Sequence, residues 1–107
     1  MIGVNFFKSI INVYIQIHRG GHIIIADDSK PLFEGDQYSC MNKIRQLIDE
    51  LSSLSGDRRL IFHIQNMTIS GDLSVVHAKG FFKSNIERLN SPRCMIEVKA
   101  GLYNVFA

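Results

Sequence analysis

The fold is decided by residues 11–26, which read INVYIQIHRGGHIIIA. Apolar and polar residues alternate over residues 11–18, and this period of two turns one face of a strand toward a core. Residues 19–21 read RGG, and glycine tolerates the positive φ angles of a tight turn. Another apolar run occupies residues 22–26. The stretch therefore predicts a β-hairpin.

Downstream of the hairpin the apolar pattern changes to that of a helix. Residues 32–34 predict a short third strand before Gly35, and apolar residues then recur at about 3.6 residues per turn over residues 37–54. This spacing predicts an amphipathic helix. Asp36 or Ser39 can cap its amino end, and Ser55-Gly56 can end it, because glycine adopts the left-handed C-cap easily.

The second half of the chain predicts further strands and a second helix. Residues 59–65 alternate again and predict a central strand. Residues 74–78 read SVVHA and favour a strand, although Asp72 could equally cap a helix here. Residues 84–87 read SNIE, a capping box that predicts a short helix over residues 84–90, ended by Ser91-Pro92. Residues 94–99 and 102–106 predict two final strands, joined or bent at Gly101.

This order of elements predicts an α+β fold. Helices over about residues 37–54 and 84–90 are expected to pack on one face of a mainly antiparallel sheet. A chain of 107 residues has room for one domain, so residues 1–107 are expected to form a single globular unit. With 46% apolar and 21% charged residues, the composition excludes the disordered and low-complexity classes.

Net charge and cysteine content limit the cellular locations and the classes of binding partner that the sequence favours. The net charge of +2 and the isoelectric point of 8.7 favour neither a general nucleic-acid coat nor an acidic mimic of nucleic acid. Cys40 and Cys94 lie far apart and form neither a zinc pattern nor a disulfide framework, which indicates a reducing, cytoplasmic location. The apolar stretch over residues 9–17 is interrupted by Asn12 and Gln16 and is too short to span a bilayer. No membrane contact is expected.

Histidines are the candidates for acid and base chemistry, because imidazole titrates near neutral pH. His18 and His22 flank the predicted hairpin turn, and a metal site there would need Asp27 or Asp28 as a further ligand. The sequence leaves open whether these two histidines converge in space with the remaining pair, His63 and His77.

A nuclease-like alternative would combine His18 or His22 with His77 and Lys79, since RNA cleavage needs a base, an acid and a cation. Nothing in the spacing requires those residues to converge. No nucleophile elbow and no glycine-rich phosphate loop occurs in the sequence. We therefore expect no catalytic site, no bound metal and no cofactor.

Basic residues supply the candidate binding site. Lys43 and Arg45 lie near the start of the predicted long helix, where the helix dipole disfavours cations. Together with Arg58 and Arg59, expected nearby after the returning turn, they could face an anionic surface. The alternative is an ordinary solvated helix face on which Arg45 pairs with Asp49 one turn later.

These observations favour a protein that binds another protein. The hypothesis is a small inhibitor of the immunity-protein or antitoxin kind, which neutralises a toxin by direct binding through Lys43, Arg45, Arg58 and Arg59. The alternatives are a small histidine-dependent RNase-like enzyme and a nucleic-acid-binding regulator. The apolar carboxyl-terminal strand also suggests a homodimer formed through an edge strand.

Overall fold

The structure, a computed structural model, describes residues 10–68, 73–89, 91 and 93–104, the last four of them as backbone. In chain order its elements are β1 (Ile10–Ile17), the 3-10 turn η1 (Arg19–Gly21), β2 (Ile23–Ala26), β3 (Pro31–Gly35), α1 (Gln37–Ser52), β4 (Arg58–Asn66), α2 (Leu73–Glu87) and β5 (Cys94–Asn104). The α+β class predicted from the sequence is confirmed.

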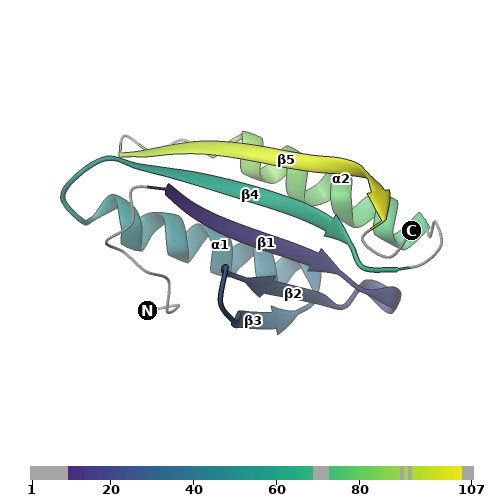
Figure 1. Cartoon of the computed structure of the whole chain (residues 1–107). Coiled ribbons are helices and arrows are strands. Elements are labelled where there is room, and N and C mark those ends of the chain that lie inside the picture. The colour runs from purple at the N-terminus through teal and green to yellow at the C-terminus, as the bar shows by residue number, and fades with distance from the viewer. Residues whose placement is uncertain (1–9, 69–72, 90, 92, 105–107) are drawn as a thin grey trace.

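The five strands form one mixed sheet in the order β3-β2-β1-β4-β5 (Figure 1). β1, β2 and β3 form an antiparallel meander. β4 pairs in parallel with β1, and β5 pairs in parallel with β4. The expectation of a mainly antiparallel sheet is therefore wrong for half of the strand pairs, because each helix carries the chain across and returns it in the same direction.

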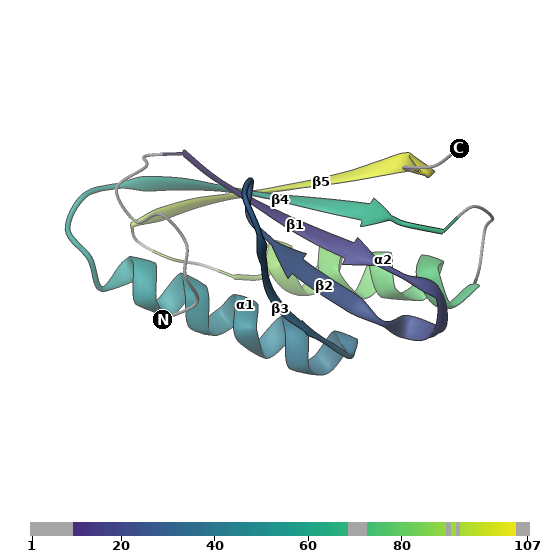
Figure 2. The same cartoon turned by 60° about the horizontal axis from the view of Figure 1, so that its bottom comes forward.

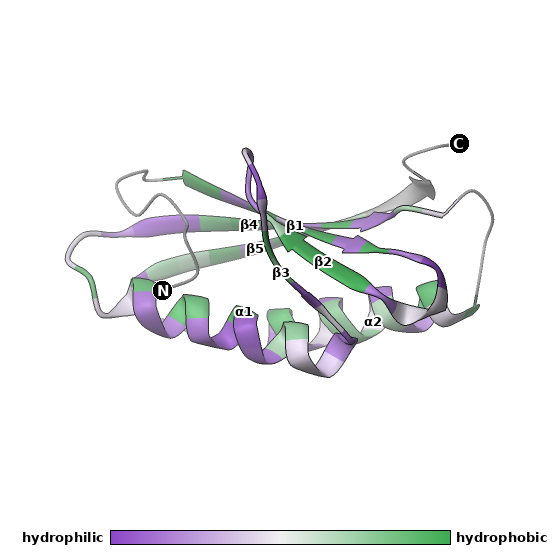
Figure 3. Ribbon diagram, turned by 90° about the horizontal axis from the view of Figure 1, so that it is seen from below, coloured by the Kyte–Doolittle hydropathy of each residue, from purple (hydrophilic) through white to green (hydrophobic). Residues whose placement is uncertain are grey.

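Both helices cover the same face of the sheet, and no helix of the described residues lies on the other face (Figure 2). The core lies between the sheet and the helices. Every second residue of β1 is buried in it, namely Ile11, Val13, Ile15 and Ile17. From α1 the buried residues are Cys40, Met41, Ile44, Leu47, Ile48 and Leu51. Hydrophilic and hydrophobic colours alternate along α1 in Figure 3, as expected of an amphipathic helix.

The predicted hairpin and long helix are confirmed, with small differences at their ends. Gly20 and Gly21 have φ angles of 77° and 79°, which explains the glycine pair in the turn. Asp36 caps α1, because its carboxylate accepts a hydrogen bond from the backbone N–H of Ser39 at 2.8 Å. The helix ends at Ser52 rather than at Leu54, and Gly56 bends the loop that follows.

The second helix differs most from its prediction. The sequence predicts a strand over residues 74–78 and a helix that starts at Ser84, whereas α2 runs without interruption over Leu73–Glu87. Asp72, the alternative cap, lies outside the described residues. The residues of α2 that are buried against the sheet are Val75, Ala78, Phe82 and Ile86. Their spacing is that of a helix, and it joins the segment predicted as a strand to the one predicted as a helix.

The last two predicted strands are one continuous strand, β5, whose backbone passes through Gly101 to Asn104. Residues 105 and 106 of the predicted final strand lie outside the described residues. Neither helix is long and apolar enough to cross a bilayer, among the residues that the structure describes.

Candidate functional site

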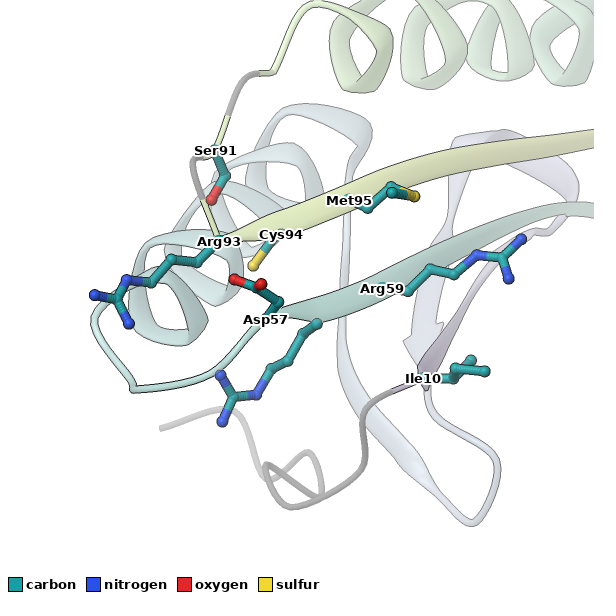
Figure 4. Close-up of a pocket in the computed structure, with 8 residues that line it drawn as sticks. Ile10, Asp57, Arg59, Ser91, Arg93, Cys94 and Met95 are labelled. Carbon is teal, nitrogen blue, oxygen red and sulfur yellow. The ribbon is translucent and has the colours of Figure 1, made fainter.

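A pocket of about 600 Å³ opens where β1, β4 and β5 begin (Figure 4). We call it the arginine pocket. Its lining residues are Ile10, Asp57, Arg58, Arg59, Ser91, Arg93, Cys94 and Met95. Two of the four cations predicted as a binding site, Arg58 and Arg59, are among them.

Parallel strand pairing brings these distant residues together. Arg58 and Cys94 are register partners at the first positions of β4 and β5, and the backbone N–H of Arg58 donates to the carbonyl of Arg93 at 2.9 Å. Arg59 is the partner of Ile10 on one side and of Met95 on the other. The amino ends of three adjacent parallel strands therefore form one wall of the pocket.

Hydrogen bonds orient the three guanidinium groups. Arg58 donates to the carbonyl oxygens of Ser55 and Gly56, at 3.1 and 3.2 Å. Arg93 donates to the carbonyl oxygen of Leu54 at 3.3 Å. Arg59 donates from Nε to Oε1 of Glu97 at 2.6 Å. Backbone carbonyls orient a guanidinium without adding negative charge. The lining residues carry three guanidinium groups and one carboxylate, that of Asp57.

Apolar side chains flank Arg59 in this lining. Ile10 is 48% exposed and Met95 is 66% exposed, and both line the pocket. Large apolar side chains in an exposed, concave site lose contact with water when a partner covers them. Methionine and arginine are enriched in protein interfaces, where lysine is depleted. The lining therefore has the composition of a protein-binding surface.

The other two predicted cations lie elsewhere, on α1. The ammonium group of Lys43 is 5.3 Å from the centre of the Phe33 ring on β3, a cation–π distance. Arg45 donates to the side-chain oxygens of Asn42 and Asn85, at 3.2 and 3.3 Å. The structure thus divides the predicted set into two pairs. The expected proximity fails because Arg58 and Arg59 follow the carboxyl end of α1, whereas Lys43 and Arg45 lie near its middle.

The histidines are distributed over the molecule. The rings of His18 and His22 are 6.2 Å apart across the hairpin turn, and Nε2 of His22 is 3.1 Å from Oε2 of Glu34. His77 is exposed on α2, and His63 lies on the sheet face opposite the helices, beside Lys99 in register. Within the described ranges, no three residues of the types His, Cys, Asp and Glu are grouped so that they could hold a metal ion.

A polar network on the open sheet face was missed by the sequence analysis. The Tyr14 hydroxyl donates to Oδ1 of Asp28 at 2.8 Å, and the Tyr14 ring stacks on His63 at 4.8 Å. Oδ1 of Asn12 accepts from Nε2 of His63 at 2.9 Å, while the Asn12 amide nitrogen is 3.5 Å from Asp28. The sequence feature that could have indicated this network is the series of polar residues that alternates with the apolar ones in β1 and β4.

The electrostatics of this network follow from its contacts. The hydrogen bond to Asp28, together with partial burial, raises the pKa of Tyr14, because ionisation would break the bond and place two negative charges together. Partial burial and the nearby Lys99 lower the pKa of His63, while Asp28 opposes this shift. Tyr14 and His63 are therefore both neutral near pH 7, with the Tyr14 hydroxyl bound to Asp28 and the His63 ring nitrogen bound to Asn12.

Comparison with known protein families, with curated proteins and with solved structures gives no match. The arguments for function therefore rest on the geometry and chemistry of the arginine pocket.

Proposed function

We propose that this chain acts by binding another protein, and that the arginine pocket receives an acidic segment of that partner. The observation that carries the proposal is the pairing of exposed Ile10 and Met95 with three oriented guanidinium groups in one concave site. Arginine binds carboxylates through two parallel hydrogen bonds, which gives both strength and orientation. Apolar contact with Ile10 and Met95 adds binding free energy by excluding water.

A protein partner fits this lining better than a nucleic acid. Phosphate contacts are made by cations that track a backbone, and the net charge of +2 gives a weak field for attracting one. In the arginine pocket exposed apolar side chains flank Arg59, and Arg59 is already paired with Glu97. Binding should therefore weaken only moderately as salt is added.

A more specific form of the proposal is an inhibitor that neutralises a toxin, in the manner of an immunity protein or antitoxin. Such a protein needs a complementary surface and no catalytic set. It would act in the cytoplasm, which the two buried free cysteines favour. This form further requires a one-to-one complex and loss of the partner's toxic activity in that complex.

The test compares two double variants that remove the same number of charges. Arg58→Gln with Arg93→Gln keeps hydrogen-bond donors in the arginine pocket, and Lys43→Gln with Arg45→Gln does the same on α1. Immobilised chains are incubated with nuclease-treated native lysate, and the affinity for the retained protein is then measured. We expect the pocket variant to bind at least about tenfold more weakly, since charged hot-spot contacts commonly contribute this much.

The α1 variant is expected to bind like the wild type, and thermal melts check that both variants fold. Equal affinity of the pocket variant and the wild type would refute docking in the pocket. Retention that disappears after nuclease treatment would assign the surface to a nucleic acid instead.

A further inference from the structure

The two edges of the sheet are protected to very different degrees. β3 is a short edge strand that begins with Pro31, and its pairing with β2 shifts register between Ile25 and Ala26. Short length, proline and irregular pairing all hinder the addition of another strand. β5 lies at the opposite edge, has eleven residues and contains no proline. Its pairing with β4 keeps one register from Cys94 to Ala100 and shifts only after Ala100. In the described residues β4 is its sheet neighbour, so its outer edge is suited to pairing with another strand.

The sequence of β5 is complementary to itself in the antiparallel direction. With a two-fold axis at Val98, Glu97 of one copy lies opposite Lys99 of the second copy, and the reverse pair forms on the other side of the axis. Opposite charges in such cross-strand pairs stabilise a sheet, and a symmetric dimer contains the pair twice. Ile96 faces Ala100 in the same register. No charge meets a like charge across this part of the edge.

α2 presents a second feature on the same side of the molecule. Its Phe81 ring contacts Tyr38 at 5.3 Å and its Asn85 accepts from Arg45, so this flank of α2 faces α1. Half a turn away, at about 100° per residue, lie Val76 and Lys83. Val76 is 60% exposed.

That opposite flank is turned toward the outer edge of β5. Among the strands, α2 packs mostly against β5, whereas α1 packs mostly against β3 and β2 (Figure 1). Gly80 lies near the middle of α2, where a Cβ atom would meet nothing within 4 Å. A second helix can therefore approach closely at this point. Antiparallel pairing of two β5 strands about an axis perpendicular to the sheet keeps both helix layers on one face and brings the two α2 helices side by side.

We propose that this chain forms a two-fold homodimer through β5, in which two sheets join into one and Val76 of each α2 becomes buried against the second copy. The occupant of the edge is thus a second copy of this chain. The dimer edge and the arginine pocket share β5, because Met95 lines the pocket and Glu97 binds Arg59. Lys99 and Val76 are not part of the pocket lining, so variants at these two positions test the dimer separately from the pocket.

Sedimentation equilibrium of the purified chain over a range of concentrations tests the dimer. The wild type should approach twice the chain mass of 12.1 kDa as its concentration rises. Lys99→Glu places two carboxylates opposite each other and should weaken the dimer by about tenfold or more. Glu97→Lys with Lys99→Glu restores opposite charges across the axis but removes the ion pair of Glu97 with Arg59, so it should recover part of the affinity. Lys30→Glu makes the same charge change in the loop before β3 and should have no effect.

Val76→Arg provides a separate test on α2, because an exposed helix position tolerates arginine in the monomer. We expect it to weaken the dimer while the circular dichroism spectrum is unchanged. A wild type that stays monomeric at every concentration would overturn the proposal. This holds even if a peptide from another protein is found to add to β5. A dimer that resists both Lys99→Glu and Val76→Arg would overturn it as well.

Discussion

Burial and neighbouring groups shift the pKa values of individual ionisable side chains in this protein and so set their charge state. The Cys40 thiol is buried under β2, donates to the carbonyl of Ile23 at 3.7 Å, and has its pKa raised to about 12 by burial. It is therefore an uncharged core residue at neutral pH, with little of the thiolate that reactive cysteines use. His63 is held neutral by a different combination, partial burial and the positive charge of Lys99.

The lowered pKa of His63 makes stability depend on pH. Below the ordinary histidine pKa of 6.5 the unfolded chain binds a proton that the folded chain resists, so the free energy of unfolding falls as the pH falls through this window. His63→Gln removes the titrating group and should flatten the dependence. Urea unfolding at a series of pH values measures this pH dependence of the free energy of unfolding. His77→Gln, at an exposed position on α2, should keep the wild-type slope, and an equally steep slope in His63→Gln would contradict the assignment.

Elements that bury one face and expose the other were predictable from the sequence, because their apolar residues recur at a regular spacing. β1 alternates strictly, and α1 repeats its apolar residues at helical spacing, so each shows its period within a single element. α2 has a weaker pattern, because β-branched Val75 and Val76 favour a strand locally and Gly80 has a low intrinsic helix propensity. Packing of Phe82 and Ile86 under the sheet overrides those local preferences. The apparent capping box at Ser84 is an internal part of that helix.

The candidate site was predictable in part for a related reason. Arg58 and Arg59 adjoin a recognisable strand, and both line the arginine pocket. Arg93 was missed because its proximity depends on the parallel register of β4 with β5, in which Arg58 pairs with Cys94. Strand order and register are set by long-range packing and crossovers, and no local spacing in the sequence reports them.

In the hairpin, the positive φ of Gly20 requires a residue that tolerates the left-handed backbone conformation. Gly20→Ala puts a Cβ atom on a residue with φ of 77°, and we expect a loss of about 1 kcal/mol in the free energy of unfolding. Gly20→Asn should lose less, since asparagine tolerates the left-handed region better. Urea unfolding of both variants measures the difference. Alanine and asparagine variants of equal stability would show that the backbone strain at this position is negligible.

The whole molecule has one core, shared by the sheet and both helices, so each element depends on the others for burial. Side chains from β1, β2, α1, β4 and α2 belong to the same buried cluster. The radius of gyration of 13.4 Å is close to the value of about 13 Å expected for a domain of this length. α2, whose local sequence is ambiguous, is therefore expected to unfold together with the rest of the chain.

Phe82 connects α2 to this shared core and is fully buried. Phe82→Ala should lower the free energy of unfolding by about 3 to 5 kcal/mol, a large part of the total of about 5 to 15 kcal/mol typical of a domain. Phe82→Leu retains part of the volume and should cost less, which keeps the comparison measurable if the alanine variant unfolds. Ser84→Ala, two residues along on the exposed side, serves as the control and should change little.

If α2 belongs to the single core, circular dichroism and tyrosine fluorescence report one coincident transition in Phe82→Leu. Loss of helix signal ahead of the tyrosine signal would mean that α2 unfolds independently of the sheet.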